Sequence, residues 1–457
     1  MNIVIIGAGG VGRYIASLLS KEEYNVMLVD IDEKKLEKAA MTIDVGTRRG
    51  SGTDWMLLDD LLELSPDFLI ALTNNDEINL TSCAIAKHLG YPSTIARVRD
   101  NRFLNRIRLD FSHIFEVDYF IGPELLVAND IVKYLVMPGS LAVESFAHGA
   151  VLLRTLLIPQ TWQKGGTPVK ELNFPKGMIA GLIRREGAKA DTVGSDFSKQ
   201  VLFPHGDSYI FPGDEVTFIG EADVIINLNK FLGIKEKKIR SAVLAGGSMT
   251  AFNLAKLLEA RDIDVRILEK NFERCRWLAQ ELPNCSIINH DATDFEFLRA
   301  EKIGLSDVFI ACSDKDEVNI LTSILAKEVG CEEAISMLSN ISITSFMAKF
   351  GINYAVSPRV SAADHILSQI LGGKVTSLVS FYENQAEVME VNVSMESRVV
   401  GIPLSDLGPL LPKDMLIAII QNRGRIMVAH GNRVISPGDT VIVITHPRHV
   451  KEMENIF

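Results

Sequence analysis

The chain has 457 residues, too many for one ordinary domain, and its length suggests about three or four domains. Its composition, with 47% hydrophobic and 23% charged residues, is that of a globular protein. The net charge of −11 argues against a general nucleic-acid-binding protein, because such proteins usually carry a basic surface.

The cysteines and the apolar runs indicate a cellular compartment. None of the five cysteines forms a C-x-x-C pair, which is typical of a reducing compartment, and we expect most of them to be small buried hydrophobic residues. The chain opens directly on a strand pattern, so we expect no signal peptide. No apolar run approaches the roughly 20 residues of a membrane span. The sequence therefore predicts a soluble, cytoplasmic protein that reaches a membrane only through a partner.

Residues 1–137 alternate short apolar runs with segments of helical period. Strands are predicted at 4–6, 26–29, 68–72 and 94–96, and helices at 11–19, 33–41, 55–64 and 76–89. A further helix is predicted near 124–136. Strands that alternate with helices predict a doubly wound parallel sheet of the Rossmann-like α/β class.

A different pattern follows this first domain. Strands at 151–158, 179–184 and 216–219 alternate with turns that contain Gly and Pro. This pattern predicts a small α+β domain over residues 138–232, and the charged stretch 235–240 is a plausible linker.

The second half of the chain repeats the first. Residues 70–90 read IALTNNDEINLTSCAIAKHLG, and residues 310–330 read IACSDKDEVNILTSILAKEVG. The repeat predicts a second Rossmann-like domain at 238–372, with a helix near 360–371, and a second α+β domain at 373–457, with strands at 386–393, 416–421 and 441–444. The chain is thus two tandem copies of one two-domain unit.

The first strand runs into a glycine-rich turn, G-A-G-G-V-G, that opens a helix. In this context Gly7 permits a tight turn, Gly9 lets the backbone approach a pyrophosphate, and Gly12 allows close packing of helix on strand. Gly10 and Val11 complete the turn, where the helix N-terminus offers N–H groups to phosphates. The alternative is a glycine-rich turn with only a structural role.

Two side chains extend this predicted site. Asp30 ends the second strand, where a carboxylate accepts hydrogen bonds from ribose hydroxyls. It disfavours NADP, whose 2′-phosphate it would repel, but it does not separate NAD(H) from ATP or ADP. Arg13 is either a contact for a further phosphate or an exposed arginine of the first helical turn.

The second copy has a degenerate turn. It runs through Gly246, Gly247, Ser248 and Met249 to Ala251, so that serine and alanine replace two glycines, while Glu269 stands where Asp30 stands. Small residues persist, so a backbone approach to a nucleotide is still predicted. The alternative is that this second turn no longer binds a nucleotide and is retained only for packing.

Further lining residues follow from the fold, because ligands lie outside the carboxyl ends of the strands in such sheets. In the first copy these residues are Ser51, Thr73, Asn74 and Arg97, and in the second copy they are Asp291, Cys312 and Ser313. Met337 replaces Arg97, so the two sites should differ in the phosphate charge that they prefer.

No catalytic or metal-binding constellation is evident. The nine histidines are scattered, without a carboxylate or lysine at a recognisable catalytic spacing. The Asp76-Glu77 pair and its repeat, Asp316-Glu317, each open a helix, where acids stabilise the positive end of the helix dipole, so we interpret them as helix caps. His446 and His449 alone do not make a metal site.

With these residues in view, the chain resembles the TrkA family, the regulatory subunits of bacterial Trk potassium uptake systems. Members carry two RCK (or KTN) domains, each followed by a TrkA-C domain. The resemblance covers essentially the whole chain and rests on four motifs. These are the GAGGVG turn with Asp30, the T-N-N-D-E-x-N stretch from Thr73, the G-P-E of residues 122–124, and the P-G-D near the end of each TrkA-C domain.

The resemblance implies a regulatory function without catalytic activity. Family members form a dimeric or tetrameric gating ring beneath a membrane potassium transporter subunit of the TrkH or TrkG kind. They bind NAD(H) and ATP or ADP in the first unit and at least NAD-type nucleotides in the second, and the nucleotide changes the ring. Arg13 matches a position that meets a terminal phosphate in related rings. Glu124 lies where some relatives place an interface cation, and its counterpart Arg359 puts such a site in doubt in copy two. The TrkA-C domains are expected to bind small effectors or to dimerise.

Two other functions remain open on the sequence. One is an NAD-dependent oxidoreductase, which would need an acid or base facing the nicotinamide. The other is a nucleotide-sensing regulator of a different channel, antiporter or efflux protein, because the same domains serve such systems.

Overall fold

The structure is a computed structural model that describes residues 1–104, 108–137, 139–185, 200–234, 238–339, 343–352, 354–370, 375–382, 385–412, 414–422 and 424–457. The chain divides into two compact units. One unit joins Met1–Val132 with Ile239–Ile366, and the other joins Lys133–Lys238 with Leu367–Phe457. Of the predicted linker at 235–240, residues 235–237 lie outside the described residues.

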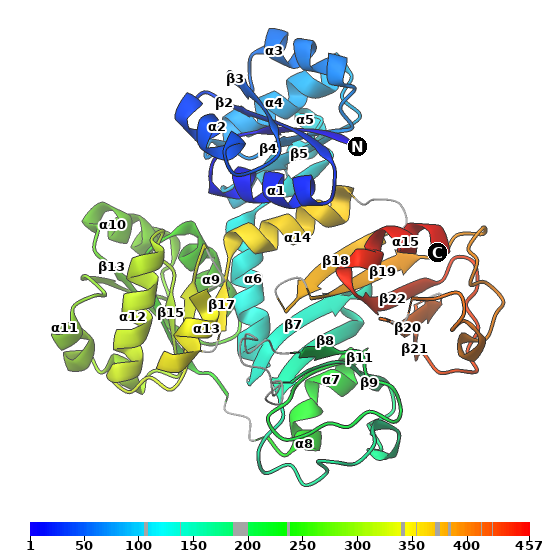
Figure 1. Ribbon diagram of the computed structural model, residues 1–457. Coiled ribbons are helices and arrows are strands. Elements are labelled where there is room, and N and C mark those ends of the chain that lie inside the picture. Colours follow the sequence, from blue (N-terminus) through cyan, green and yellow to red (C-terminus); the bar gives the residue numbers. More distant parts are fainter. Residues whose placement is uncertain are drawn as a thin grey trace, which may run out of the picture. The chain divides into compact units, whose positions relative to one another are not determined.

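The first unit contains two six-stranded parallel sheets of the same topology (Figure 1). In the first sheet the strand order is β3-β2-β1-β4-β5-β6. Its strands are β1 (Asn2–Ile6), β2 (Asn25–Asp30), β3 (Gly46–Arg49), β4 (Phe68–Ala71), β5 (Ser93–Arg97) and β6 (Tyr119–Ile121). The chain reverses its direction of winding between β1 and β4, so a crevice opens at their carboxyl ends.

Helices connect these strands. They are α1 (Gly10–Lys21), α2 (Glu33–Ala40), α3 (Trp55–Asp60), α4 (Asp76–Leu89), α5 (Phe111–Ile114) and α6 (Pro123–Val136). The helix predicted at 55–64 is α3 followed by a 3₁₀ turn at Leu61–Leu64. Strand β3 has no apolar pattern because all four of its residues are exposed at the sheet edge.

The second sheet repeats this order as β14-β13-β12-β15-β16-β17. Its strands are β12 (Ser241–Ala245), β13 (Asp264–Glu269), β14 (Ser286–Asn289), β15 (Val308–Ala311), β16 (Ala334–Met337) and β17 (Tyr354–Val356). Its helices are α9 (Met249–Glu259), α10 (Phe272–Glu281), α11 (Phe295–Ala300), α12 (Asp316–Glu328), α13 (Thr344–Met347) and α14 (Pro358–Ile370). The two Rossmann-like domains predicted from the repeat are therefore confirmed.

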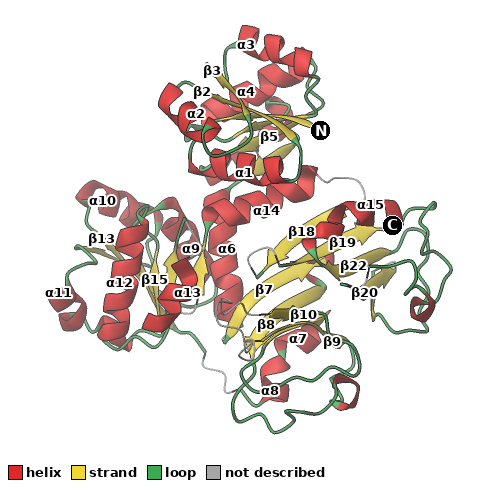
Figure 2. Ribbon diagram, viewed as in Figure 1, coloured by secondary structure: helices red, strands yellow, loops and turns green. Residues whose placement is uncertain are grey.

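The central strands of these sheets read as continuous apolar runs because both faces are covered by helices (Figure 2). Within β1, Val4 and Ile6 pack with Leu69 and Ala71 of β4 and with Cys83 of α4. Cys275, Cys312 and Cys331 are buried as well, as predicted, whereas Cys285 is half-buried. Because β1 and β4 are packed in the core, the position of the crevice at their carboxyl ends is fixed.

The last helix of each parallel-sheet domain contacts the other domain of the unit. The Ser361 hydroxyl of α14 donates to Oδ2 of Asp130 in α6 at 2.8 Å, and Tyr354 of β17 donates to the Asp130 carbonyl at 3.5 Å. These bonds join residues from opposite halves of the chain.

The second unit contains two five-stranded antiparallel sheets. The first has the order β10-β9-β11-β8-β7 and the second β18-β19-β22-β20-β21. The first comprises β7 (Ser140–Phe146), β8 (Val151–Leu157), β9 (Met178–Arg185), β10 (Gln200–Leu202) and β11 (Glu215–Glu221), with helices α7 (Ala222–Ile226) and α8 (Leu228–Leu232). The second comprises β18 (Val375–Phe381), β19 (Ala386–Asn392), β20 (Met415–Asn422), β21 (Arg425–Val428) and β22 (Thr440–Thr445), with helix α15 (Val450–Ile456).

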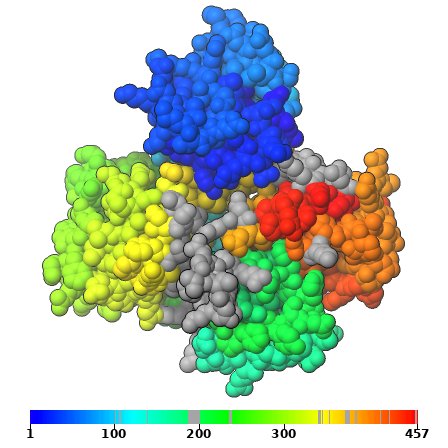
Figure 3. Space-filling model, in the orientation of Figure 1, coloured from blue at the N-terminus to red at the C-terminus, as the bar shows by residue number. Residues whose placement is uncertain are grey.

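The two antiparallel sheets share one hydrophobic core. Leu153, Leu182 and Ile219 of the first sheet pack with Val388 and Ile444 of the second. In the space-filling view the green residues of the first sheet's domain adjoin the orange and red residues of the other (Figure 3). The predicted α+β domains thus form a pair within one chain. Among the described residues, no helix combines the length and the apolar character that crossing a bilayer requires.

Candidate functional site

The first glycine-rich turn joins β1 to α1 and has the backbone that its sequence predicts. Gly7 has φ +107°, which side-chain-bearing residues rarely adopt. A Cβ on Gly12 would overlap the carbonyl oxygen of Gly7, whereas a Cβ on Gly9 would meet nothing within 4 Å. Gly12 is therefore required by packing, and Gly9 faces open space.

This open space is a hollow of about 350 Å³ at the start of α1. It is lined by Ala8, Gly9, Gly10, Arg13, Lys34, Lys35 and Lys38. No side chain caps α1, so the N–H groups of its first turn remain available to a ligand. Nε of Arg13 is buried and has no hydrogen-bond partner among the described residues. Free N–H groups and four cationic side chains make this hollow suited to an anion.

Asp30 lies at the end of β2 and faces the turn. Its carboxylate accepts hydrogen bonds from the backbone N–H of Ala8 at 2.7 Å and of Asp32 at 2.8 Å. In the second copy Glu269 accepts from the N–H of Gly247 and of Asn271, both at 2.7 Å. Each acid thus fixes its turn, and an ionised carboxylate retains lone pairs for ribose hydroxyls.

The predicted residues at the ends of β4 and β5 are brought together by Asn79 of α4. The Oδ1 of Asn79 accepts from the N–H of Thr73 at 2.9 Å, and its Nδ2 donates to the carbonyl oxygens of Thr73 and Arg97 at 3.1 and 2.9 Å. Asn319 makes the equivalent bonds to Ser313 and Met337. The asparagine of the repeated D-E-x-N motif is therefore a clamp between neighbouring strand ends, a role that sequence reasoning missed.

Asp76 and Glu77 lie in the first turn of α4, as predicted, but the interpretation of Asp76 as the helix cap is wrong. The side chain that caps α4 is Asn75, whose Oδ1 accepts from the N–H of Ile78. Asp76 instead accepts from the N–H groups of Arg99 and Asp100, beyond the end of β5. Burial raises the pKa of Asp76, while those N–H groups act to lower it. Asp316 likewise accepts from the N–H of Ser339, so both acids hold the loop that follows the fifth strand.

Arg97 lies at the end of β5, as predicted, but its guanidinium is already engaged. It is 8% exposed and donates to Glu124 Oε1 at 2.7 Å and to Asn74 Oδ1 at 3.2 Å. Arg99 approaches the same Glu124 oxygen at 3.2 Å. The charge of Arg97 is thus balanced inside the domain.

The predicted residues after the third strands bond locally. Ser51 Oγ lies 2.8 Å from Thr53 Oγ1. Asp291 accepts from the N–H and the hydroxyl of Thr293, and these bonds lower its pKa. Both residues shape a turn at the carboxyl edge of their sheets.

The second glycine turn differs from the first in its hydrogen bonds. Gly246 has φ +101°, but the Oγ of Ser248 accepts from the N–H of Ala251 at 3.2 Å and so caps α9. Arg274 donates from Nε to the carbonyl of Gly247 and from Nη2 to the Sδ of Met249. Burial lowers the pKa of Arg274. Part of this turn's hydrogen-bonding capacity is therefore already used.

Cys312 ends β15 and is fully buried, and burial raises the pKa of its thiol to about 12. Only its backbone is therefore available to a ligand. Among the residues that the structure describes, no cluster of His, Cys, Asp and Glu has the arrangement of a metal site.

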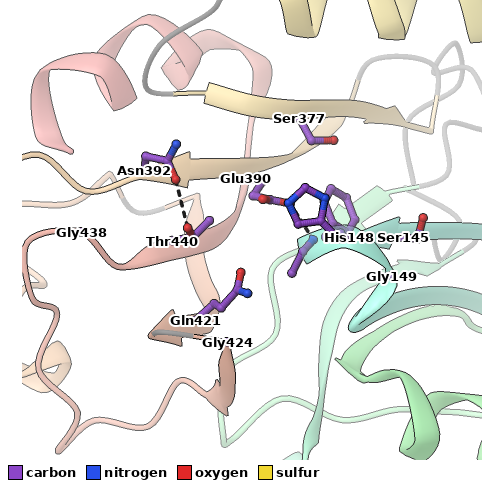
Figure 4. Close-up of a pocket in the computed structure, with 12 residues that line it drawn as sticks. Ser145, His148, Gly149, Ser377, Glu390, Asn392, Gln421, Gly424, Gly438 and Thr440 are labelled. Atoms are coloured by element: carbon purple, nitrogen blue, oxygen red, sulfur yellow. Dashed lines mark hydrogen bonds between the residues drawn. The ribbon is translucent and has the colours of Figure 1, made fainter. Parts of the chain in front are cut away.

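A second hollow, of about 560 Å³, lies between the two antiparallel sheets and was not predicted (Figure 4). Its lining comes from both halves of the chain: Ser145, Phe146, Ala147, His148, Gly149, Ser377, Glu390, Asn392, Gln421, Gly424, Gly438 and Thr440. Glu390 Oε2 accepts from the N–H of Ala147 at 2.7 Å. Thr440 donates to Asn392 at 3.0 Å. These residues lie far apart in sequence, so no local pattern could have joined them.

Comparison with known proteins gives family matches to both kinds of domain. The TrkA-N domain family matches residues 3–116 and 242–358, and the TrkA-C domain family matches residues 388–457. The first match falls on both parallel sheets.

Relatives match over the full length. The Trk system potassium uptake protein TrkA of Halomonas elongata is 31% identical, covering 100% of this chain and 98% of that protein. The TrkA homolog 1 of Methanosarcina mazei is 30% identical, with both proteins covered completely. A solved structure of the GsuK channel bound to NAD has the same fold, with a TM-score of 0.61 at 15% identity, covering 100% of this chain and 78% of that one.

Proposed function

The chain belongs to the TrkA family of Trk system potassium uptake proteins, and on this premise we propose that it is a nucleotide-binding regulatory subunit. It controls potassium entry through a membrane transporter subunit of the TrkH or TrkG kind. The family membership and the full-length match to named potassium uptake proteins support this proposal.

One observation carries the nucleotide-binding part of the proposal. The uncapped N-terminus of α1 opens into a hollow with Arg13 and three lysines, directly beside the carboxylate of Asp30. Phosphates fit the N–H groups and cations, and ribose hydroxyls fit the carboxylate.

The nucleotides are NAD(H) and ATP or ADP. The acid at position 30 favours an unmodified adenosine ribose, which all of them carry. The GsuK channel, which has this fold, was solved with NAD. In the first site the proposed binding residues are Gly7, Gly9, Gly10, Val11, Gly12, Arg13, Asp30, Ser51, Thr73, Asn74 and Arg97. In the second they are Gly246, Gly247, Ser248, Met249, Glu269, Asp291, Cys312 and Ser313.

The first site is the stronger of the two. Its helix N-terminus is uncapped, whereas Ser248 occupies an N–H group of α9 and Arg274 covers the turn. Of the predicted contacts, Arg13 is the side chain in the first site whose charge remains available, because Arg97 is paired with Glu124.

The regulator has no catalysis of its own. It divides into RCK domains at 1–137 and 238–372 and TrkA-C domains at 138–232 and 373–457. It works at the cytoplasmic face of the membrane as a dimer or tetramer ring, and nucleotides bias the ring by their different affinities for its two states. Coupling between two sites is typically about 1–3 kcal/mol.

Calorimetric titration with NADH, ATP and ADP tests the binding proposal. We expect the wild type to bind all three, Gly9→Asp to abolish ATP binding, and Ser248→Asp to spare it. A carboxylate at position 9 repels phosphates from a position that is otherwise open. Asp30→Ala should weaken both NADH and ATP, and unchanged affinity would show that the assigned site is wrong.

A transport assay tests the regulatory part. Potassium flux through a TrkH-type transporter in vesicles is measured with and without the chain and each nucleotide. A flux that depends on both supports the proposal. Nucleotide binding without any effect on flux points instead to a different channel or antiporter, which a pull-down with membrane extracts would identify. NADH oxidation by the chain alone would support an oxidoreductase.

A further inference from the structure

Arg359 of the second half lies against the glycine turn of the first half. It is in the first turn of α14, and α14 runs beside α1 (Figure 1). A Cβ on Gly10 would lie 2.8 Å from Nη2 of Arg359 and 2.9 Å from its Nε. Burial, and to a smaller extent the charge of Asp364 in α14, raises the pKa of Tyr14 in α1, which agrees with the nearness of the two helices.

Among the residues that the structure describes, the guanidinium of Arg359 has no counter-ion. Within the described ranges, no hydrogen bond or ion pair engages its side chain, and the same holds for the side chain of Arg13. Two unpaired arginines thus stand at the positive end of α1, together with Lys34, Lys35 and Lys38. Like charges that gather at one place repel, and a bound anion offsets that repulsion.

We propose that Arg359 is a phosphate-binding residue of the first nucleotide site, contributed by the second half of the chain. This inference rests on the proposed nucleotide-binding function. The planar guanidinium donates a fork of N–H groups that matches phosphate oxygens, and Gly10 leaves the space through which it reaches the turn. The ligand class is a nucleotide with a free terminal phosphate, because ADP and ATP carry more charge there than the diphosphate of NAD.

The arrangement is not mirrored in the other half. The corresponding residue of the first half, Glu124, is acidic and is already bound by Arg97 and Arg99. A nucleotide in the first site is therefore held by both halves of the chain at once, and its binding energy depends on their contact. This gives the first site a route for coupling to the rest of the molecule that its own domain does not supply.

The test is calorimetric titration of the full chain with ATP and NADH at several salt concentrations. The variants are Arg359→Gln, Arg359→Lys and the control Arg299→Gln, an exposed arginine of α11 in the same half. Loss of a charge-assisted contact predicts that Arg359→Gln binds ATP about tenfold or more weakly, with a smaller loss for NADH. Arg359→Lys should fall between Arg359→Gln and the wild type, and Arg299→Gln should match the wild type. The salt dependence of ATP affinity should become shallower in Arg359→Gln, because one charged contact is gone.

Unchanged ATP affinity in Arg359→Gln would overturn the inference, while Gly9→Asp would still report on the proposed function. A weakened affinity with unchanged salt dependence would also overturn it, since that result identifies a structural role. Thermal unfolding without nucleotide checks that each variant is folded. If the wild type bound no nucleotide, both the proposed nucleotide-binding function and the role of Arg359 would be refuted.

Discussion

The side-chain amide of Asn79 donates to the carbonyl oxygen of Arg97 at 2.9 Å, and so ties helix α4 to the end of the neighbouring strand β5. Asn79 is fully buried and bonds Thr73 with the same amide group. One side chain thus fixes the ends of two strands that line the candidate site.

Replacing this side chain should loosen those strand ends selectively. Asn79→Ala leaves buried backbone groups of Thr73 and Arg97 without partners, which costs about 2–3 kcal/mol. We expect faster amide hydrogen exchange at β4 and β5, with little change at β15 and β16. Asn319→Ala in the second half is the matched control and should give the reverse pattern. Equal exchange in both variants and the wild type would contradict the clamp.

The buried pair of Arg97 and Glu124 yields a second prediction. Glu124→Ala leaves Arg97 as an uncompensated buried charge and should destabilise the protein by about 3–5 kcal/mol in urea unfolding. The double variant Arg97→Met with Glu124→Leu should recover most of this loss. Glu33→Ala removes the partner of Arg49 in an exposed pair and should change stability by less than about 1 kcal/mol. If Glu124→Ala and Glu33→Ala changed the free energy of unfolding by similar amounts, the buried pair would contribute no more to stability than the exposed one.

Gly12 and Gly9 of the first turn should differ in how well they tolerate substitution by alanine. Gly12→Ala places a Cβ against the carbonyl of Gly7 and should cost about 1–3 kcal/mol, together with a loss of ATP and NADH binding. Gly9→Ala meets no atom within 4 Å, so its thermal unfolding should match that of the wild type. Circular dichroism and calorimetry on the two variants measure both effects. A Gly9→Ala variant less stable than Gly12→Ala would contradict this prediction.

The thiol of Cys285 should become reactive only at alkaline pH. Burial, and to a smaller extent the charge of Glu259, raises the pKa of this thiol to about 11. Because the thiolate is the reactive form, labelling by iodoacetamide should be slow at pH 7.5 and accelerate as the pH rises toward that value. Glu259→Gln lowers the pKa and should speed labelling at pH 9, as followed by mass spectrometry. Fast labelling at pH 7.5 in the wild type would refute the prediction.

The sequence predicted the parallel sheets and the glycine turns well, because local constraints determine them. Strands such as β1 and β4 are buried on both faces and read as apolar runs, and Gly7 and Gly12 occupy positions that exclude a side chain. The exposed edge strand β3 carries no such signal and was not identified.

The parts of the site that sequence reasoning missed depend on contacts between distant segments. Asp76 opens a helix, which suggested a cap, but the N–H groups that it accepts from belong to Arg99 and Asp100. The pairing of Arg97 with Glu124 and the approach of Arg359 to Gly10 likewise join residues with no local relationship. Only the three-dimensional arrangement brings them together.

The core shared by the two antiparallel sheets has a consequence for assembly. Gly181 of one sheet faces Ile444 of the other, and the missing side chain gives that isoleucine its space. Because one polypeptide carries both surfaces, their association is intramolecular and does not depend on the protein concentration. This pairing therefore survives dilution that would separate two single-copy subunits with the same interface. Within this shared assembly the two halves differ at corresponding positions, as Glu124 and Arg359 show.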